Sequence, residues 1–356
     1  MMKRLIKFPD GSSLSGTVLR SLSLAVLMTF AIKAGAEEAP PLKLIHTIPL
    51  PGIEGDFDHF AVDLQGQRLF LTEEDHKSVE VFDLRTFKSI HSIPGFARPH
   101  WVLYIPESDE LFVTDGPDEN ENLKIIKASS YRPVHVVNLG QGADCIAYDP
   151  LTKYLYVAYG GRSARSHSSS IGIIDTTTGQ HLGDIRIEAA RLEGMDIDVP
   201  AKRLFVNITS KDEIGVIDLE KRKLVATWSL DLEGDANVPM RLDQANHRLF
   251  VATRTPTSFI VVDTDSGKAV SDLSTGLNAD DIFYDAAHKR IYISCGEGFV
   301  DVFQQLDADH YKSLARVPTG PRARNSFFAP TLNLYFVPVP QEGNNQATIL
   351  VYSPQP

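Results

Sequence analysis

The chain has 356 residues, of which 43% are hydrophobic and 23% are charged, an ordinary composition for a globular protein. Its formal net charge is −11, which argues against a general affinity for nucleic-acid phosphates or anionic lipid surfaces. Length alone would allow two or more domains.

The first 36 residues differ from the rest and predict a secretory signal peptide. Basic residues at positions 3, 4, 7 and 20 precede an apolar run over 21–32, and small residues at 34–36 fit a cleavage site near Ala36. The run is too short to cross a bilayer, so we expect a periplasmic or secreted protein without a stable membrane anchor, a retained anchor being the alternative. Five Lys or Arg and one Asp lie in 1–36, a surplus of four positive charges, so the remaining chain carries −15 rather than −11.

A four-residue phrase recurs seven times along the remaining chain. It reads Arg-Leu-Phe-Leu at 68–71 and Arg-Leu-Phe-Val at 203–206 and 248–251. The equivalent second residues of the copies are Leu69, Leu111, Leu155, Leu204, Leu249, Ile291 and Tyr335. Their spacings lie between 42 and 49 residues, in the range where each repeat is one four-stranded propeller blade. We therefore predict an all-β, seven-bladed β-propeller over 37–356 as a single domain, and we expect a monomer.

Runs of aromatic and β-branched residues predict the strands of each blade. In the first repeat the predicted strands span 59–62, 68–72, 78–84 and 88–93. The last repeat supplies only three, over 325–328, 334–337 and 348–352. The segment 42–48 resembles a fourth strand, so we expect it to complete the last blade, close the ring and remove an open sheet edge.

Two sets of residues that look reactive are interpreted as structural. Aspartates stand five residues before five copies of the phrase, in the first hairpin turn of a blade, where Asp favours a turn. They are Asp63, Asp149, Asp198, Asp243 and Asp285. The two cysteines, Cys145 and Cys295, belong to blades on nearly opposite sides of the predicted ring, too far apart for a disulfide. We expect both to be buried and unpaired.

The repeat resembles the YVTN-type motif of the YncE-like family of secreted seven-bladed propellers. The matching segments are Phe112-Val113-Thr114-Asp115, Tyr156-Val157-Ala158-Tyr159, Phe205-Val206-Asn207 and Phe250-Val251-Ala252-Thr253. The resemblance spans the whole chain after residue 36 and implies the propeller fold and an extracytoplasmic location. It implies no particular reaction, because families of this kind include members without one. Nucleic-acid binding has been suggested for relatives, but the charge of −15 opposes it here.

The repeat also predicts where a site lies, because aligned residues occupy equivalent places in the ring. The start of the innermost strand reads Asp58, His100, Asp144, Glu193, Val238, Asp280 and Arg324 in the seven blades. The next position reads His59, Trp101, Cys145, Gly194, Pro239, Asp281 and Asn325, and the one after it is mostly apolar. Polar residues therefore gather at one mouth of the central channel.

We interpret this mouth as a ligand-binding site. The candidate residues are Asp58, His59, His100, Asp144, Glu193, Asp280, Asp281 and Arg324. Converging carboxylates repel one another unless a cation, a proton or Arg324 compensates them. Oxygen ligands alone would suit Ca²⁺ or Mg²⁺, whereas a set of Asp58, Asp144 and Asp280 with His59 and His100 would suit a transition metal. Simple solvation of a wet channel mouth is the structural alternative.

Two function classes follow from this site. The first is a binding propeller that takes a small ligand or an envelope protein at the mouth. The second is a metal-assisted enzyme, of hydrolase, lactonase or lyase type, at the same place. A Gly- and Ser-rich segment over 160–170 lies on this face, where it would be either a lid or a flexible loop.

Overall fold

The computed structural model describes residues 39–116, 122–232 and 236–356. The predicted signal peptide over 1–36 and its cleavage site near Ala36 lie outside the described residues. Within the described ranges, none of the helices has the length and apolar character needed to cross a membrane. Residues Ala39–Pro356 form one compact unit, and the following description concerns that unit.

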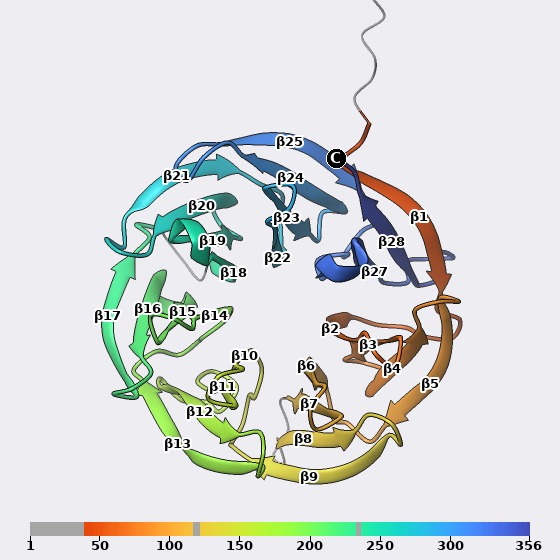
Figure 1. Cartoon of the computed structure of the whole chain (residues 1–356), viewed down its shortest axis with the longest axis horizontal. Helices are drawn as coiled ribbons and strands as arrows, with labels where there is room; N and C mark the ends of the chain where they lie inside the picture. Colours follow the sequence, from red (N-terminus) through yellow and green to blue (C-terminus); the bar gives the residue numbers. More distant parts are fainter. Residues whose placement is uncertain (1–38, 117–121, 233–235) are drawn as a thin grey trace, which may run out of the picture. The chain divides into compact units, whose positions relative to one another are not determined.

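Seven four-stranded antiparallel sheets stand in a ring and form a seven-bladed β-propeller, which confirms the predicted fold (Figure 1). Blade 1 contains β2 (Phe57–Asp63), β3 (Arg68–Glu73), β4 (Ser78–Asp83) and β5 (Lys88–Pro94). Blade 2 contains β6 (Pro99–Ile105), β7 (Glu110–Asp115), β8 (Asn122–Lys127) and β9 (Arg132–Asn138). Blade 3 contains β10 (Ile146–Asp149), β11 (Tyr154–Gly160), β12 (Ser169–Asp175) and β13 (Gln180–Ile187).

The remaining blades follow the same order from the channel outward. Blade 4 contains β14 (Met195–Asp198), β15 (Arg203–Ile208), β16 (Glu213–Asp218) and β17 (Lys223–Ser229). Blade 5 contains β18 (Asn237–Asp243), β19 (Arg248–Thr253), β20 (Ser258–Asp263) and β21 (Ala269–Ser274). Blade 6 contains β22 (Ala279–Asp285), β23 (Arg290–Cys295), β24 (Phe299–Gln305) and β25 (Tyr311–Pro318). Blade 7 contains β26 (Phe327–Ala329), β27 (Leu334–Val339), β28 (Thr348–Pro354) and β1 (Leu42–Pro49), and short 3-10 helices occupy Thr209–Lys211, Gln244–Asn246 and Pro330–Leu332.

The ring closes by pairing the two ends of the described unit, as the sequence predicts. β1 lies antiparallel to β28, with Leu42 opposite Pro354 and Pro49 opposite Thr348. Figure 1 shows β1 as the outer strand of blade 7. The closing strand matters energetically because Leu42 and Ile48 are almost fully buried.

Each blade buries both faces, because neighbouring blades supply the other half of its core. Leu69 and Leu71 of β3 pack toward blade 7, in a cluster that includes Phe336. The intervening Phe70 points the other way and packs with Val113 of blade 2. This alternation explains why the repeated phrase is apolar at consecutive positions.

Three innermost strands start later than the sequence predicts. β10 begins at Ile146 and β14 at Met195, each two residues after the predicted start, and β26 begins at Phe327 instead of residue 325. The contacts just before β26 show what replaces the missing strand residues. The backbone N–H of Ser326 donates to Asp281 Oδ2 at 2.8 Å, and the Asn325 amide donates to Asp58 Oδ1 at 3.1 Å. Polar contacts to blades 6 and 1 thus replace the start of the strand ladder.

The recurrent aspartates are turn residues, as predicted, and they also help to join the blades. Asp63 accepts hydrogen bonds from the backbone N–H of Gly66 at 2.8 Å and from Arg68 Nε at 2.9 Å. The same guanidinium donates to the carbonyl of Ala128 in blade 2. In blade 4, Arg203 repeats this arrangement with the carbonyl of Thr264 in blade 5, at 2.8 Å. The arginine of the phrase therefore links one blade to the next.

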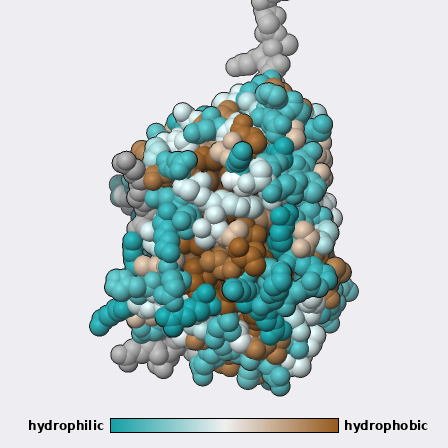
Figure 2. Space-filling view, turned by 90° about the vertical axis from the view of Figure 1, so that its left-hand side faces the viewer, coloured by the Kyte–Doolittle hydropathy of each residue, from teal (hydrophilic) through white to brown (hydrophobic). Residues whose placement is uncertain are grey.

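The outermost strands carry apolar side chains on the perimeter of the ring. Figure 2 views the side on which β17 lies and shows apolar residues gathered between hydrophilic ones. Val225 of β17 is 51% exposed, and Leu44 and Ile45 of β1 are exposed to a similar degree. These positions add little to the core, because one face of an outermost strand meets water.

Glu73, at the end of β3, is a carboxyl group buried without a visible partner. It is fully buried, and neither carboxyl oxygen forms a hydrogen bond within the described part of the chain. Burial, with a contribution from Glu80, raises the pKa of Glu73 from 4.5 to about 10. The folded protein therefore holds this group neutral at pH 7, whereas the unfolded chain ionises it.

The stability of the protein should consequently fall as the pH rises from about 4.5 toward 10, by up to about 1.4 kcal/mol per pH unit from this group. We expect Glu73→Gln to remove this slope, so that the variant gains about 4 kcal/mol over the wild type between pH 5 and pH 8. Urea denaturation at several pH values measures the difference. The same change at the exposed Glu342 is the control. Parallel pH profiles for the wild type and Glu73→Gln would contradict this account.

Candidate functional site

A polar cavity of about 160 Å³ lies at the mouth of the channel, and all seven blades contribute to its lining. The structure brings every candidate residue from the sequence to this cavity. They are Asp58, His59, His100, Asp144, Glu193, Asp280, Asp281 and Arg324. Each lies in, or up to three residues before, the innermost strand of its blade, because equivalent strands begin at the same face of the ring. Their binding role stays a prediction.

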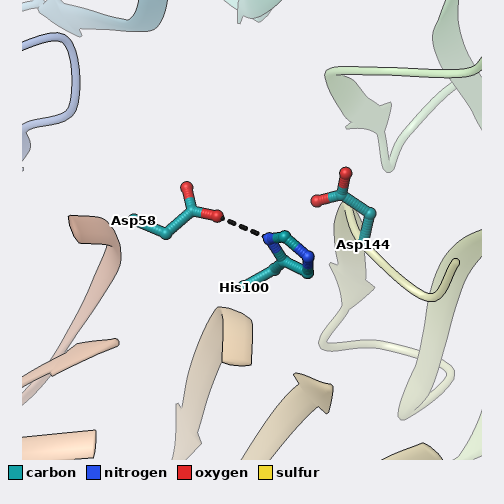
Figure 3. A group of neighbouring side chains, drawn as sticks. All are labelled: Asp58, His100 and Asp144. Carbon is teal, nitrogen blue, oxygen red and sulfur yellow. Dashed lines mark hydrogen bonds and ion pairs between the residues drawn. The ribbon is translucent and has the colours of Figure 1, made fainter. Parts of the chain in front are cut away.

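Asp58 lies between two histidines from different blades. Its Oδ1 lies 3.1 Å from His59 Nε2, and its Oδ2 lies 2.9 Å from His100 Nδ1 (Figure 3). His59 also contacts Asp281, with 3.4 Å between Nδ1 and Oδ1, and stacks on Trp101 at 3.6 Å between ring centroids. The cluster therefore connects blades 1, 2 and 6 around the channel axis.

The carboxylates keep both histidines protonated. Burial by itself would lower the pKa of His59. Asp58 and Asp281 have the larger, opposite effect and raise the pKa to about 10. Burial likewise opposes the charge of His100, but Asp144 and Asp58 raise its pKa to about 11. Burial raises the pKa of Asp58 itself, and the two imidazoliums offset this effect only in part. At neutral pH the cavity wall thus carries two imidazolium cations.

Arginines compensate most of the remaining acids. Arg324 Nε lies 2.8 Å from Asp280 Oδ2, and Arg254 pairs with the other oxygen of the same carboxylate. Arg191 Nε donates to Glu193 Oε1 at 2.6 Å. The predicted repulsion between carboxylates is therefore largely relieved by the protein itself.

The sequence did not predict three charged residues that line the mouth, namely Glu74, Arg191 and Arg254. Glu74 accepts from Arg98 Nε at 2.8 Å and lies 3.4 Å from His100 Nδ1. Burial opposes its ionisation, but His100 and Arg98 lower its pKa to about 2. Glu74 and Arg254 follow the second strands of their blades, on the same face as the mouth. Aligning those positions as well would have found both.

Asp144 differs from the other acids of the cavity. Figure 3 shows its carboxylate directed toward the imidazole of His100, with no hydrogen bond between the two. No ion pair or hydrogen bond joins this carboxylate to another residue of the described ranges. Burial and the charge of Asp144 together raise the pKa of the neighbouring Glu193. The region around Asp144 is therefore the part of the mouth best suited to accept positive charge.

The metal hypothesis fits only part of the predicted ligand set. Asp58, His100 and Asp144 each offer one ligand atom within 4.8 Å of the others. Asp144, Cys145 and Glu193 form a second such group. The predicted ligands His59 and Asp280 belong to neither group; His59 lies against Asp58, and Asp280 pairs with Arg254.

The cysteines are buried and unpaired, as predicted. Burial and the charge of Asp144 raise the pKa of Cys145 well above its usual value, so its thiol stays protonated. A protonated thiol is a poor nucleophile. Thiol chemistry at Cys145 is therefore disfavoured at neutral pH.

The Gly- and Ser-rich segment packs beside the mouth. The N–H of Gly161 donates to the Ser168 carbonyl at 3.0 Å, and the N–H of Arg162 donates to the Ala190 carbonyl of blade 4 at 2.8 Å. The segment lines a second cavity of about 160 Å³ that shares Asp144 and Glu193 with the mouth. It thus extends the wall between blades 3 and 4.

Comparisons with known proteins support the fold and nothing finer. Neither a protein-family model nor the sequence of a curated protein matches this chain. A chain of the mitotic checkpoint complex is similar in structure, with a TM-score of 0.73 at 12% identity, over 94% of this chain and 98% of that one. A chain of hydrazine synthase from Kuenenia stuttgartiensis has a TM-score of 0.67 at 17% identity, over 81% of this chain and 95% of that one. Likeness at such low identity shows the β-propeller fold alone.

Proposed function

We propose that this protein is an extracytoplasmic binding propeller of the YncE-like type, which captures a small ligand at the polar channel mouth. The observation that carries the proposal is the cavity itself, in which charged side chains from different blades are held by paired contacts. Such paired contacts cost little reorganisation when a ligand arrives, since the polar groups are already oriented. The signal-like segment over 1–36 and the motif resemblance support the location and the family.

The ligand should carry a positively charged group. The arginines and histidines of the wall pair with carboxylates, whereas the Asp144 carboxylate lines the cavity near His100 and forms no hydrogen bond or ion pair within the described ranges. An ammonium group beside Asp144 and Glu193 would compensate both acids. The net charge of −15 on the chain after residue 36 would favour the approach of a cation.

A thermal-shift screen with small ammonium compounds, such as amino acids, amino sugars and polyamines, tests this proposal. We expect at least one compound to raise the unfolding midpoint by about 3 °C or more at saturating concentration. Asp144→Asn should abolish the shift, because it removes the anchoring charge. Asp272→Asn, the same change at an exposed position of β21, should leave it intact. A screen without a hit, or a hit that survives Asp144→Asn, would contradict the proposal.

The group formed by Asp58, His100 and Asp144 supports a second candidate, a divalent metal site that would serve a metal-assisted enzyme. Calorimetry with Ca²⁺, Mg²⁺ and Zn²⁺ separates the two candidates. A metal must displace the proton of His100, so its affinity should rise between pH 7 and pH 9 and should vanish in His100→Gln. Ammonium binding does not require loss of the His100 proton, so it should survive His100→Gln, because Asp144 remains.

A further inference from the structure

The channel continues below the mouth as a second, larger cavity with a different character. It has a volume of about 380 Å³ and shares His59, Trp101 and Asp281 with the mouth, so the two spaces adjoin. Six aromatic side chains line it, namely Phe60, Trp101, Tyr104, Tyr148, Phe283 and Phe327. The sequence shows the same change, from charged residues at the strand starts to apolar residues further in.

The charged groups of this lower cavity are already engaged, whereas the buried hydroxyl of Tyr148 forms no hydrogen bond within the described residues. Asp196 accepts from the backbone N–H of Leu242 at 2.9 Å and lies 3.5 Å from Arg241. The Arg241 guanidinium lies over the ring of Phe283, 5.2 Å from its centroid. Asp281 is held by His59 and by the N–H of Ser326. What remains for a ligand is aromatic surface, since five of the six rings are only half-buried.

We infer that the lower cavity is a subsite for an aromatic ring, so that the ligand combines an ammonium head at Asp144 with an aromatic body in the channel. This inference rests on the proposed function for the head group. The volume of the lower cavity, its aromatic wall and the adjoining mouth support the ring site independently of the head group. Pockets of about 300–1,000 Å³ with apolar and aromatic walls are typical of small-molecule sites. Rings bound between aromatic side chains gain from both burial and stacking.

Three simple probes distinguish the binding of the ammonium group from the binding of the aromatic ring. Ethylammonium carries only the head, 2-phenylethanol carries only the ring, and 2-phenylethylammonium carries both. Trp101 is a natural reporter, because the chain has two tryptophans and Trp228→Phe leaves Trp101 alone. In this background, fluorescence titration should show that 2-phenylethylammonium binds at least tenfold more tightly than ethylammonium.

Two channel variants test the ring site. Val62→Phe fills the lower cavity from β2 without touching the mouth, and it should remove the tenfold gain and the binding of 2-phenylethanol while ethylammonium still binds. Tyr148→Leu removes aromatic wall instead of adding bulk, and it should reduce the gain at least threefold. Val225→Phe, on the exposed face of β17, is the matched control and should change nothing.

The outcomes distinguish failure of the inference from failure of the proposed function. A gain below threefold, or a gain that survives Val62→Phe and Tyr148→Leu, overturns the ring subsite even when ethylammonium binds. Binding of 2-phenylethanol that is lost in Val62→Phe supports the ring subsite even when neither ammonium compound depends on Asp144. In that case the ring subsite stands and the ammonium site falls.

Discussion

Replacing Leu42 and Ile48 together with alanine is expected to lower the free energy of unfolding by about 4 to 8 kcal/mol. Both side chains belong to β1 and are almost fully buried, Leu42 in the core between blades 6 and 7 and Ile48 in the core between blades 7 and 1. Each truncation leaves a cavity that the packed blades can fill only in part. A loss of this size approaches the whole stability of a typical domain.

The same strand supplies a matched control. Leu44 and Ile45 also lie on β1 but are 49% and 47% exposed, so their double replacement by alanine should cost less than about 1 kcal/mol. Urea denaturation of the two double variants and of the single variants measures the contrast. Equal effects of the two double variants would mean that the closing strand does not stabilise the ring through its buried side chains.

Asp58→Asn is expected to destabilise the protein by about 3 kcal/mol at about pH 8.5, where the Asp58 carboxyl, whose pKa burial raises to about 7, is ionised and both imidazoles stay protonated. The change removes the carboxylate that lies between His59 and His100, so two buried imidazoliums lose a shared partner. Asp281 and Glu74 remain beside them and limit the loss. The pKa values of both histidines should fall, because Asp58 is among the groups that raise them.

Denaturation and NMR titration of the two imidazoles test this prediction together. Asp272→Asn, an exposed change of the same chemistry, should stay within about 0.5 kcal/mol of the wild type. If Asp58→Asn proves neutral or stabilising while the histidine pKa values fall, the burial of the Asp58 carboxylate costs as much as its ion pairs contribute. Unchanged histidine pKa values would contradict the described network itself.

The network also bears on how a ligand would be recognised. Ion pairs between blades hold Asp58 and Asp280 in place, and Arg191 holds Glu193 within blade 4, whereas the Asp144 carboxylate forms no ion pair within the described ranges. Because the other charged side chains are held in place, a ligand would be selected by where its positive charge lies relative to Asp144 as well as by the sign of that charge. This is why Asp144 carries the proposal and the other acids support it.

The sequence by itself determined the number of blades, the strands and the way the ring closes. The phrase around Leu69 and its six equivalents recurs because every blade must bury two faces against identical neighbours. The same repeat placed Asp58, His100, Asp144 and Asp280 at one mouth, since equivalent residues of a ring occupy equivalent positions. These features follow from the regular spacing of the repeated phrase, which can be read directly from one sequence.

Only the tertiary structure decided how the charges of the mouth are paired. Arg254 with Asp280 and Arg98 with Glu74 join residues 24 to 26 positions apart, and Asp58 contacts His100 from 42 positions away. Such pairing depends on side-chain reach and direction across blade boundaries, which periodicity does not encode. The sequence predicted a ring of carboxylates that repel one another. In the folded protein histidines and arginines compensate most of these charges, and Asp144 is the acid that forms no ion pair within the described ranges.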